Sequence, residues 1–141
     1  MSSINPKKIS HIGIAVNSLD EVIPFYRDVL GLAYEGEEAV ESEQVRVAFF
    51  RIGESRIELL EPLSEESAIY KFLQKKGQGI HHIALEVCDI KQRISDLKQK
   101  GVRMIQEEPK AGAHQMNIAF LHPGATGKVL YEICEPQHRE E

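Results

Sequence analysis

Two histidines and two glutamates stand at matched places in two similar halves of this sequence. The run His11-Ile-Gly-Ile-Ala-Val16 resembles His82-Ile-Ala-Leu-Glu-Val87, and Glu58-Leu-Leu-Glu-Pro62 resembles Glu132-Ile-Cys-Glu-Pro136. One histidine on a strand is usually structural, whereas a glutamate in an apolar run is uncommon unless it is paired or bound to a metal. The coincidence of all four predicts a single divalent-metal site made of His11, Glu58, His82 and Glu132.

The types of these side chains limit the chemistry of such a site. Two imidazoles and two carboxylates suit an octahedral first-row divalent ion and leave two positions open, which fits a ligand that chelates through two oxygens. We therefore predict one divalent ion per site: cobalt, manganese, nickel or zinc. Gly13, Ala15 and Ala84 lie on the same strand faces as the two histidines, so they would leave room for a ligand.

The internal repeat predicts the elements that position these side chains. Repeat units of about 9–62 and 80–136, joined by a helical linker at 63–79, make up a single domain over 1–141. Each unit reads as a strand, a helix and three further strands. The predicted fold class is α+β, with two tandem βαβββ units that pair into one curved mixed sheet and cup the metal site.

Local signals support this order of elements. Apolar residues alternate along the first strand of each half, as expected for a strand with one buried face. Ser18 and Asp89 each precede a helical pattern and are followed three residues later by Glu or Gln, which indicates helix starts. Gly31 and Gly101 stand where left-handed caps would end these helices. Pro24 inside the first helix suggests a kink or a later start.

The remaining strands are assigned from short apolar runs between turn residues. In the first half they are expected near 32–38, 45–52 and 56–61. In the second half they are expected near 103–107, 117–122 and 129–134. The linker is expected to contain a short helix near 65–76.

Composition excludes several classes of protein. Apolar residues make up 42% and charged residues 28% of the chain, which is typical of a globular protein. A net charge of −5 without basic clusters argues against nucleic acid as a partner. No apolar run approaches the roughly 18 residues of a membrane span, and residues 1–8 lack the core of a secretory signal. A cytoplasmic location is therefore expected, with both cysteines reduced.

Several stretches resemble the vicinal oxygen chelate superfamily and, within it, the methylmalonyl-CoA epimerase family. The resemblance covers nearly the whole chain. Besides the four predicted ligands, it rests on Phe25-Tyr-Arg-Asp-Val-Leu-Gly-Leu32, Arg56-Ile-Glu-Leu-Leu-Glu-Pro62, Gly79-Ile-His-His-Ile-Ala84, Gly112-Ala-His114 and Phe120-Leu-His-Pro-Gly124.

The resemblance implies an activity: interconversion of the two epimers of methylmalonyl-CoA by removal and return of an α proton. The metal would stabilise the enolate charge, and an acid and a base would act on opposite faces of the carbon. Glu132 aligns with a family glutamate that does this work, and Glu43 is our candidate for the second base. The family's Glu-Gln-Gly-Val run lacks its glycine here, where Gln44 directly precedes Val45. Gln115 replaces the glycine that often follows Gly-Ala-His.

The implied substrate is a small CoA thioester whose phosphates require basic contacts. Lys110 and Lys128, which flank loops of the second half, are the candidates. The resemblance also implies a homodimer. By strand parity His81 points away from the predicted ligands, and we expect His114 and His122 to contact loops or substrate instead of metal.

Three other functions remain open from the sequence. A lactoylglutathione lyase would use a similar ligand set to isomerise a hemithioacetal. A ring-cleaving dioxygenase usually binds ferrous iron with two histidines and one carboxylate, so the fourth ligand, Glu58, argues against it. A non-catalytic protein that binds a small molecule on the same fold often lacks the four ligands.

Overall fold

The computed structural model describes residues 5–137 and divides them into two compact units. The first unit spans His11–His81, and the second combines the described residues up to Ser10 with those from His82 onward. The boundary falls inside strands β1 (Lys8–Ala15) and β5 (Gly79–Glu86), so each of these strands contributes residues to both units.

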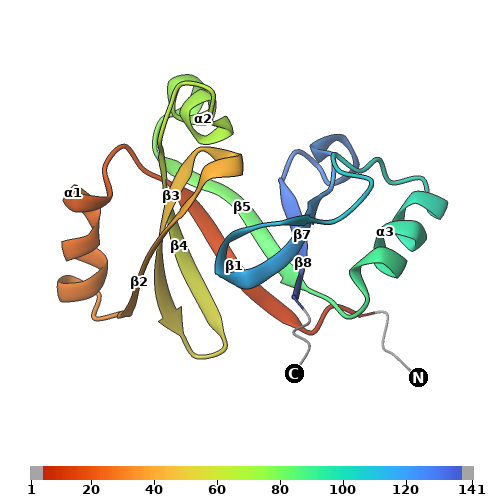
Figure 1. Ribbon diagram of the computed structural model, residues 1–141, viewed down its shortest axis with the longest axis horizontal. Coiled ribbons are helices and arrows are strands. Elements are labelled where there is room, and N and C mark those ends of the chain that lie inside the picture. Colours follow the sequence, from red (N-terminus) through yellow and green to blue (C-terminus); the bar gives the residue numbers. More distant parts are fainter. Residues whose placement is uncertain (1–4, 138–141) are drawn as a thin grey trace. The chain divides into compact units, whose positions relative to one another are not determined.

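The first unit contains a mixed sheet in the order β2-β3-β4-β1, with α1 beside it (Figure 1). Strands β1 and β4 are parallel, and the β3–β4 and β2–β3 pairs are antiparallel. The elements after β1 are α1 (Leu19–Pro24), η1 (Phe25–Val29), β2 (Ala33–Val40), η2 (Glu41–Glu43), β3 (Val45–Ile52), β4 (Ser55–Pro62) and α2 (Ala68–Lys76).

The second unit repeats this topology in the order β5-β8-β7-β6, with α3 beside β7 and β8 (Figure 1). Its β5–β8 pair is parallel, and its β7–β8 and β6–β7 pairs are antiparallel. The α+β class and the repeated βαβββ order are therefore confirmed. The elements after β5 are α3 (Ile90–Gln99), β6 (Lys110–Ala111), η3 (Ala113–Gln115), β7 (Met116–Phe120), η4 (Pro123–Ala125) and β8 (Tyr131–Pro136).

The helices begin where the capping signals predict. The Ser18 hydroxyl accepts the Glu21 N–H at 3.4 Å, and the Asp89 carboxylate accepts the Gln92 N–H at 3.4 Å. Gly31, with φ +75°, adopts the predicted left-handed conformation, as does Gly101 with φ +86°. The kink expected at Pro24 takes the form of a wider turn, because α1 passes directly into the π-helical η1 there.

Each helix packs on one face of its sheet and buries an apolar core. The two cores are built from equivalent positions of their units. Each contains the residue after the first strand, residues from the first turns of the helix, and inward-facing residues of the later strands. In the first unit the core is Val16, Leu19, Ile23, Ala48, Phe50 and Leu59. In the second it is Val87, Ile90, Ile94, Met104, Ala119 and Ile133. The other face of the first sheet carries His11 and Glu58. In the second unit that face carries His82 and Glu132 together with a further buried apolar cluster of Ala84, Met116, Ile118 and Cys134.

The prediction of a strand near 103–107 is wrong. Only an isolated bridge joins Met104 to Leu121, and the next paired segment is the two-residue β6. Pro109 has no N–H to give to a ladder, and the Gln106 side chain accepts the Phe120 N–H at 2.6 Å in place of a backbone carbonyl. Irregular chain therefore takes the place of the expected strand, and its Gln106 side chain accepts the hydrogen bond that the Phe120 N–H of β7 would give to a strand.

The linker helix begins later than expected. Helix α2 starts at Ala68 instead of residue 65, because Ser67 caps it by accepting the Ile69 N–H at 3.1 Å. Among residues 5–137, none of the helices has the length and apolar character needed to cross a membrane. The division of the whole chain into a single domain with the predicted unit boundaries stays a prediction.

Candidate functional site

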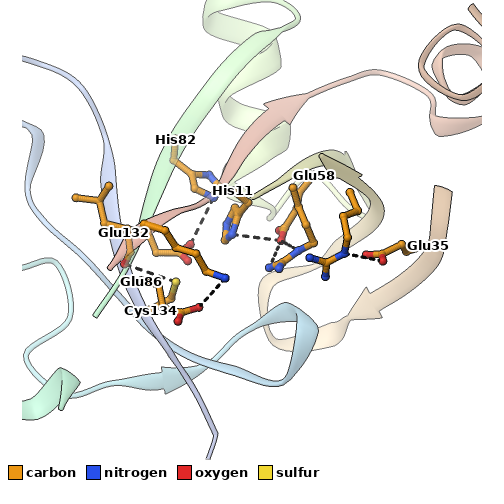
Figure 2. Close-up of polar contacts among 11 residues, drawn as sticks. His11, Glu35, Glu58, His82, Glu86, Glu132 and Cys134 are labelled. Atoms are coloured by element: carbon orange, nitrogen blue, oxygen red, sulfur yellow. Dashed lines mark hydrogen bonds and ion pairs between the residues drawn. The ribbon is translucent and has the colours of Figure 1, made fainter. Parts of the chain in front are cut away.

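The first unit holds a buried histidine–glutamate pair. The His11 Nδ1 atom, on β1, lies 3.3 Å from the Glu58 Oε2 atom on β4 (Figure 2). Both side chains are deeply buried, with exposed fractions of 4% for His11 and 3% for Glu58. A carboxylate at this depth is costly without compensating charge or hydrogen bonds, so Glu58 requires the partners that surround it.

The second unit holds the equivalent pair. The His82 Nε2 atom, on β5, lies 3.4 Å from the Glu132 Oε1 atom on β8 (Figure 2). Exposed fractions are 6% for His82 and 3% for Glu132. The ring of Phe120 packs edge-on against the His82 ring with centroids 5.4 Å apart, which limits how the imidazole can turn.

The two pairs occupy the same register in their sheets. Gly13 is the cross-strand partner of Glu58, and Ala84 is the partner of Glu132. Both partners follow their histidine by two residues and therefore share its face. Gly13 and Ala84 thus share the faces of the histidines as predicted, and their role in leaving room for a ligand stays a prediction. The sequence repeat is thus reproduced residue by residue in the pairing of the strands.

Arg56 is a component of the first unit that the sequence reasoning missed. Its Nη2 and Nε atoms donate to Glu58 Oε2 at 3.1 and 3.3 Å. The arginine is itself only 7% exposed. A signal existed in the sequence, because Arg56 stands two residues before Glu58 and strand alternation puts both side chains on one face.

Each Glu-x-x-Glu-Pro run also carries a second glutamate that faces the helix. Glu61 Oε1 accepts the Leu19 N–H at 2.8 Å, at the start of α1. Glu135 accepts the Asp89 and Ile90 N–H groups at 2.6 and 3.2 Å, at the start of α3. Carboxylates at helix N-termini are favourable because they satisfy open N–H groups and oppose the helix dipole. These two glutamates are therefore structural.

Glu43, the candidate second base, ends the short η2 helix and is half-buried. Gln44 follows it with φ +51° and ψ +51°, a left-handed conformation that glycine adopts without strain. Its side-chain amide donates to the Glu41 carbonyl at 2.9 Å, which helps to hold the turn. The chain therefore makes this turn with a glutamine in a left-handed conformation, without the glycine of the family's run.

The two lysine candidates lie in different environments of the second unit. Lys110 is half-buried on β6, paired with Ile118. Lys128 is exposed in the turn before β8, where its N–H donates to the Pro123 carbonyl at 3.0 Å. Their role as phosphate contacts stays a prediction.

The other histidines have distinct surroundings. His114 and Gln115 both adopt positive φ, at +60° and +58°, in the loop before β7. The His122 Nδ1 atom accepts the Gly124 N–H at 3.0 Å and so closes a turn. His81 packs edge-on against Phe72 with ring centroids 5.1 Å apart. Burial, and next the charge of Lys76, lowers the pKa of His81 to about 4.

Comparison with known proteins identifies the family. Residues 10–120 match the family model of the Glyoxalase/Bleomycin resistance protein/Dioxygenase superfamily. The chain belongs to this superfamily.

Within the superfamily, the chain is similar to epimerases along nearly its whole length. Human mitochondrial methylmalonyl-CoA epimerase is 40% identical over 130 residues, which cover 92% of this chain and 74% of that protein. The ethylmalonyl-CoA/methylmalonyl-CoA epimerase of Cereibacter sphaeroides is 38% identical over 89% of this chain and 96% of that protein.

A solved structure extends this similarity to the fold. It is a Streptomyces coelicolor methylmalonyl-CoA epimerase variant in complex with 2-nitronate-propionyl-CoA, which is 38% identical to this chain. The two align with a TM-score of 0.91 over 97% of this chain and 99% of that one. The chain therefore belongs to the methylmalonyl-CoA epimerase family, and the predicted fold class is confirmed.

Proposed function

We propose that this chain is a methylmalonyl-CoA epimerase that interconverts the (R) and (S) forms of its substrate by moving the α proton. The observation that carries the proposal is the pair of buried histidine–glutamate contacts, one in each repeat and both in the same strand register. Relatives that share 38–40% identity with the chain are epimerases of such thioesters, which supports the same chemistry here.

We further propose that His11, Glu58, His82 and Glu132 together hold one divalent ion: cobalt, manganese, nickel or zinc. The donor set supports this, because imidazole and carboxylate ligands suit these ions. The burial of both carboxylates supports it too, since buried carboxylates are rare unless paired or metal-bound. When bound, such an ion supplies a Lewis acid for the negative charge that develops on the thioester oxygen.

The proton transfers fall to glutamates of the chain itself. Epimerisation requires one group to take the α proton and another to return one on the opposite face. Glu132 is proposed for one face and Glu43 for the other. Two features support these roles: Glu132 is buried beside His82, and Glu43 is half-buried on the short helix that precedes β3.

Contacts to the rest of the substrate are proposed from charge. Lys110 and Lys128 would bind the phosphates of coenzyme A, because a protein of net charge −5 needs local cations to hold such an anion. A homodimer and a cytoplasmic location complete the proposal, and analytical ultracentrifugation and cell fractionation would test them.

The deciding experiment follows the α proton directly. Metal-loaded protein is mixed in heavy water with methylmalonyl-CoA of one configuration, next to a chelator-treated control, and NMR records exchange and inversion. We expect both, and only with metal. Glu43→Gln should allow exchange of one epimer without inversion, since one base remains. If no divalent ion gives exchange, the epimerase proposal fails, and glutathione hemithioacetals become the next substrates to test.

A further inference from the structure

Arg56 and Glu58 form a buried ion pair on one face of β4. Two nitrogens of the guanidinium donate to the same carboxylate oxygen, Oε2, at 3.1 and 3.3 Å. The His11 Nδ1 atom lies 3.3 Å from that oxygen as well. The orientation of the Glu58 carboxylate is thus set from two directions by groups that are themselves more than nine-tenths buried.

The neighbouring strand explains why Arg56 stays with this partner. Arg51 on β3 is directly opposite Arg56 in the register. Like charges placed opposite one another destabilise a sheet unless each has a counter-ion. Arg51 has its own, because its Nε donates to Glu35 Oε2 at 2.9 Å (Figure 2). Two separate ion pairs, Arg51–Glu35 and Arg56–Glu58, therefore lie side by side.

This arginine belongs to only one of the two repeats. The Ile83 N–H donates to the Leu130 carbonyl at 3.1 Å, and Ile83 and Tyr131 are cross-strand partners. Leu130 thus precedes Glu132 by two residues, as Arg56 precedes Glu58. An aliphatic side chain cannot donate hydrogen bonds, so Glu132 has no equivalent of the Arg56 contact from this position of its strand.

We infer that Arg56 is a positioning residue that holds Glu58 in one fixed orientation as a ligand of the proposed divalent ion. The inference rests on the proposed function. Arginine stays charged and presents a rigid fork that matches a carboxylate, so it restricts the carboxylate more than lysine would. Hydrogen bonds that orient metal ligands typically change metal affinity 10- to 100-fold when removed. Glu58 is then a ligand held in place, and proton transfer is left to other glutamates.

Binding of Mn²⁺ in the absence of substrate tests this role. Calorimetry and the EPR signal of free Mn²⁺ give the dissociation constant for the wild-type chain, Arg56→Met, Arg56→Lys and the matched control Arg51→Met. We expect Arg56→Met to bind Mn²⁺ about 10- to 100-fold more weakly. Arg56→Lys should lie between, because it keeps the charge and loses the fork. Arg51→Met should stay within about twofold of wild type, since Arg51 contacts Glu35 and no proposed ligand.

The direction in which Mn²⁺ affinity changes distinguishes a positioning role of Arg56 from an effect of its charge alone. Removal of a positive charge near a cation would by itself strengthen Mn²⁺ binding, so unchanged or tighter binding by Arg56→Met overturns the inference. If Arg56→Met does not fold, as judged by circular dichroism, Arg56→Lys decides in the same way.

The same experiment distinguishes this inference from the proposed function. A wild-type chain that binds no divalent ion overturns both. A wild-type chain that binds Mn²⁺ without epimerising methylmalonyl-CoA, while Arg56→Met binds it more weakly, overturns the proposed substrate and upholds the positioning role. A wild-type chain that epimerises, with equal Mn²⁺ affinity in Arg56→Met, overturns the positioning role alone.

Discussion

Acidification should destabilise the fold through His81, the residue just before the predicted ligand His82. His81 packs against Phe72 of α2, and the Nζ atom of Lys76 lies 5.8 Å from the centre of the same ring. Burial, and secondarily the charge of Lys76, lowers the pKa of His81 from 6.5 to about 4. The folded state therefore favours the neutral imidazole.

The sign and size of the effect follow from proton linkage. Between pH 6.5 and pH 4 the unfolded chain takes up a proton at this position and the folded chain does not, so stability falls as the pH falls. The loss is about 2 kcal/mol at pH 5 and about 3 kcal/mol at pH 4. Well above pH 6.5 both states are neutral here, and His81 then contributes no pH dependence.

Urea denaturation at pH 7, 5 and 4 measures this loss. Other groups also titrate in this range, so the quantity of interest is the difference between wild type and His81→Gln. The variant should lose about 3 kcal/mol less stability than wild type between pH 7 and pH 4. An NMR titration of the His81 ring protons, assigned with the variant, should give a midpoint near 4. A midpoint near 6.5 in the folded protein would refute the reasoning.

Three further predictions concern the caps, a strained turn and metal binding. Glu135→Ala should lower the free energy of unfolding by about 2 kcal/mol and Glu61→Ala by about 1 kcal/mol. Glu135 accepts two N–H groups at a helix start, whereas Glu61 accepts one. Urea denaturation measures both losses, and equal losses would contradict this reason. The Gln44→Gly variant should be more stable than Gln44→Ala by about 1 kcal/mol, because φ is +51° at this position and glycine adopts that conformation without strain. Thermal melts measure the difference, and a more stable alanine variant would exclude left-handed strain at Gln44. Mn²⁺ at about 100 times its dissociation constant should stabilise the folded chain by about 2.7 kcal/mol, and a chelator should reverse this. Glu58→Ala should reduce the stabilisation by Mn²⁺. If this variant is stabilised as much as wild type, Glu58 is not a ligand.

Much of the fold and of the candidate site could be predicted because strand alternation is a strong local signal. It assigned the faces of His11 and His82 correctly, and the register of their neighbours agrees. It could not predict the loss of a strand near 103–107, because the Gln106 side chain replaces a backbone partner from a distance in sequence. Arg56 was missed although alternation places it on the same face of β4 as Glu58, because the sequence does not show that both side chains are buried there.

The spacing of the two glutamates in each Glu-x-x-Glu-Pro run has a consequence for how the strands find their alignment. Three residues is an odd number, so Glu58 and Glu61 project from opposite faces of β4. A slip of one residue would turn the helix-capping carboxylate toward the site and the buried one toward the helix, and both would lose their partners at once. Glu132 and Glu135 impose the same requirement on β8. Each run therefore acts as a register lock, which penalises misaligned sheets during folding before any ion is bound.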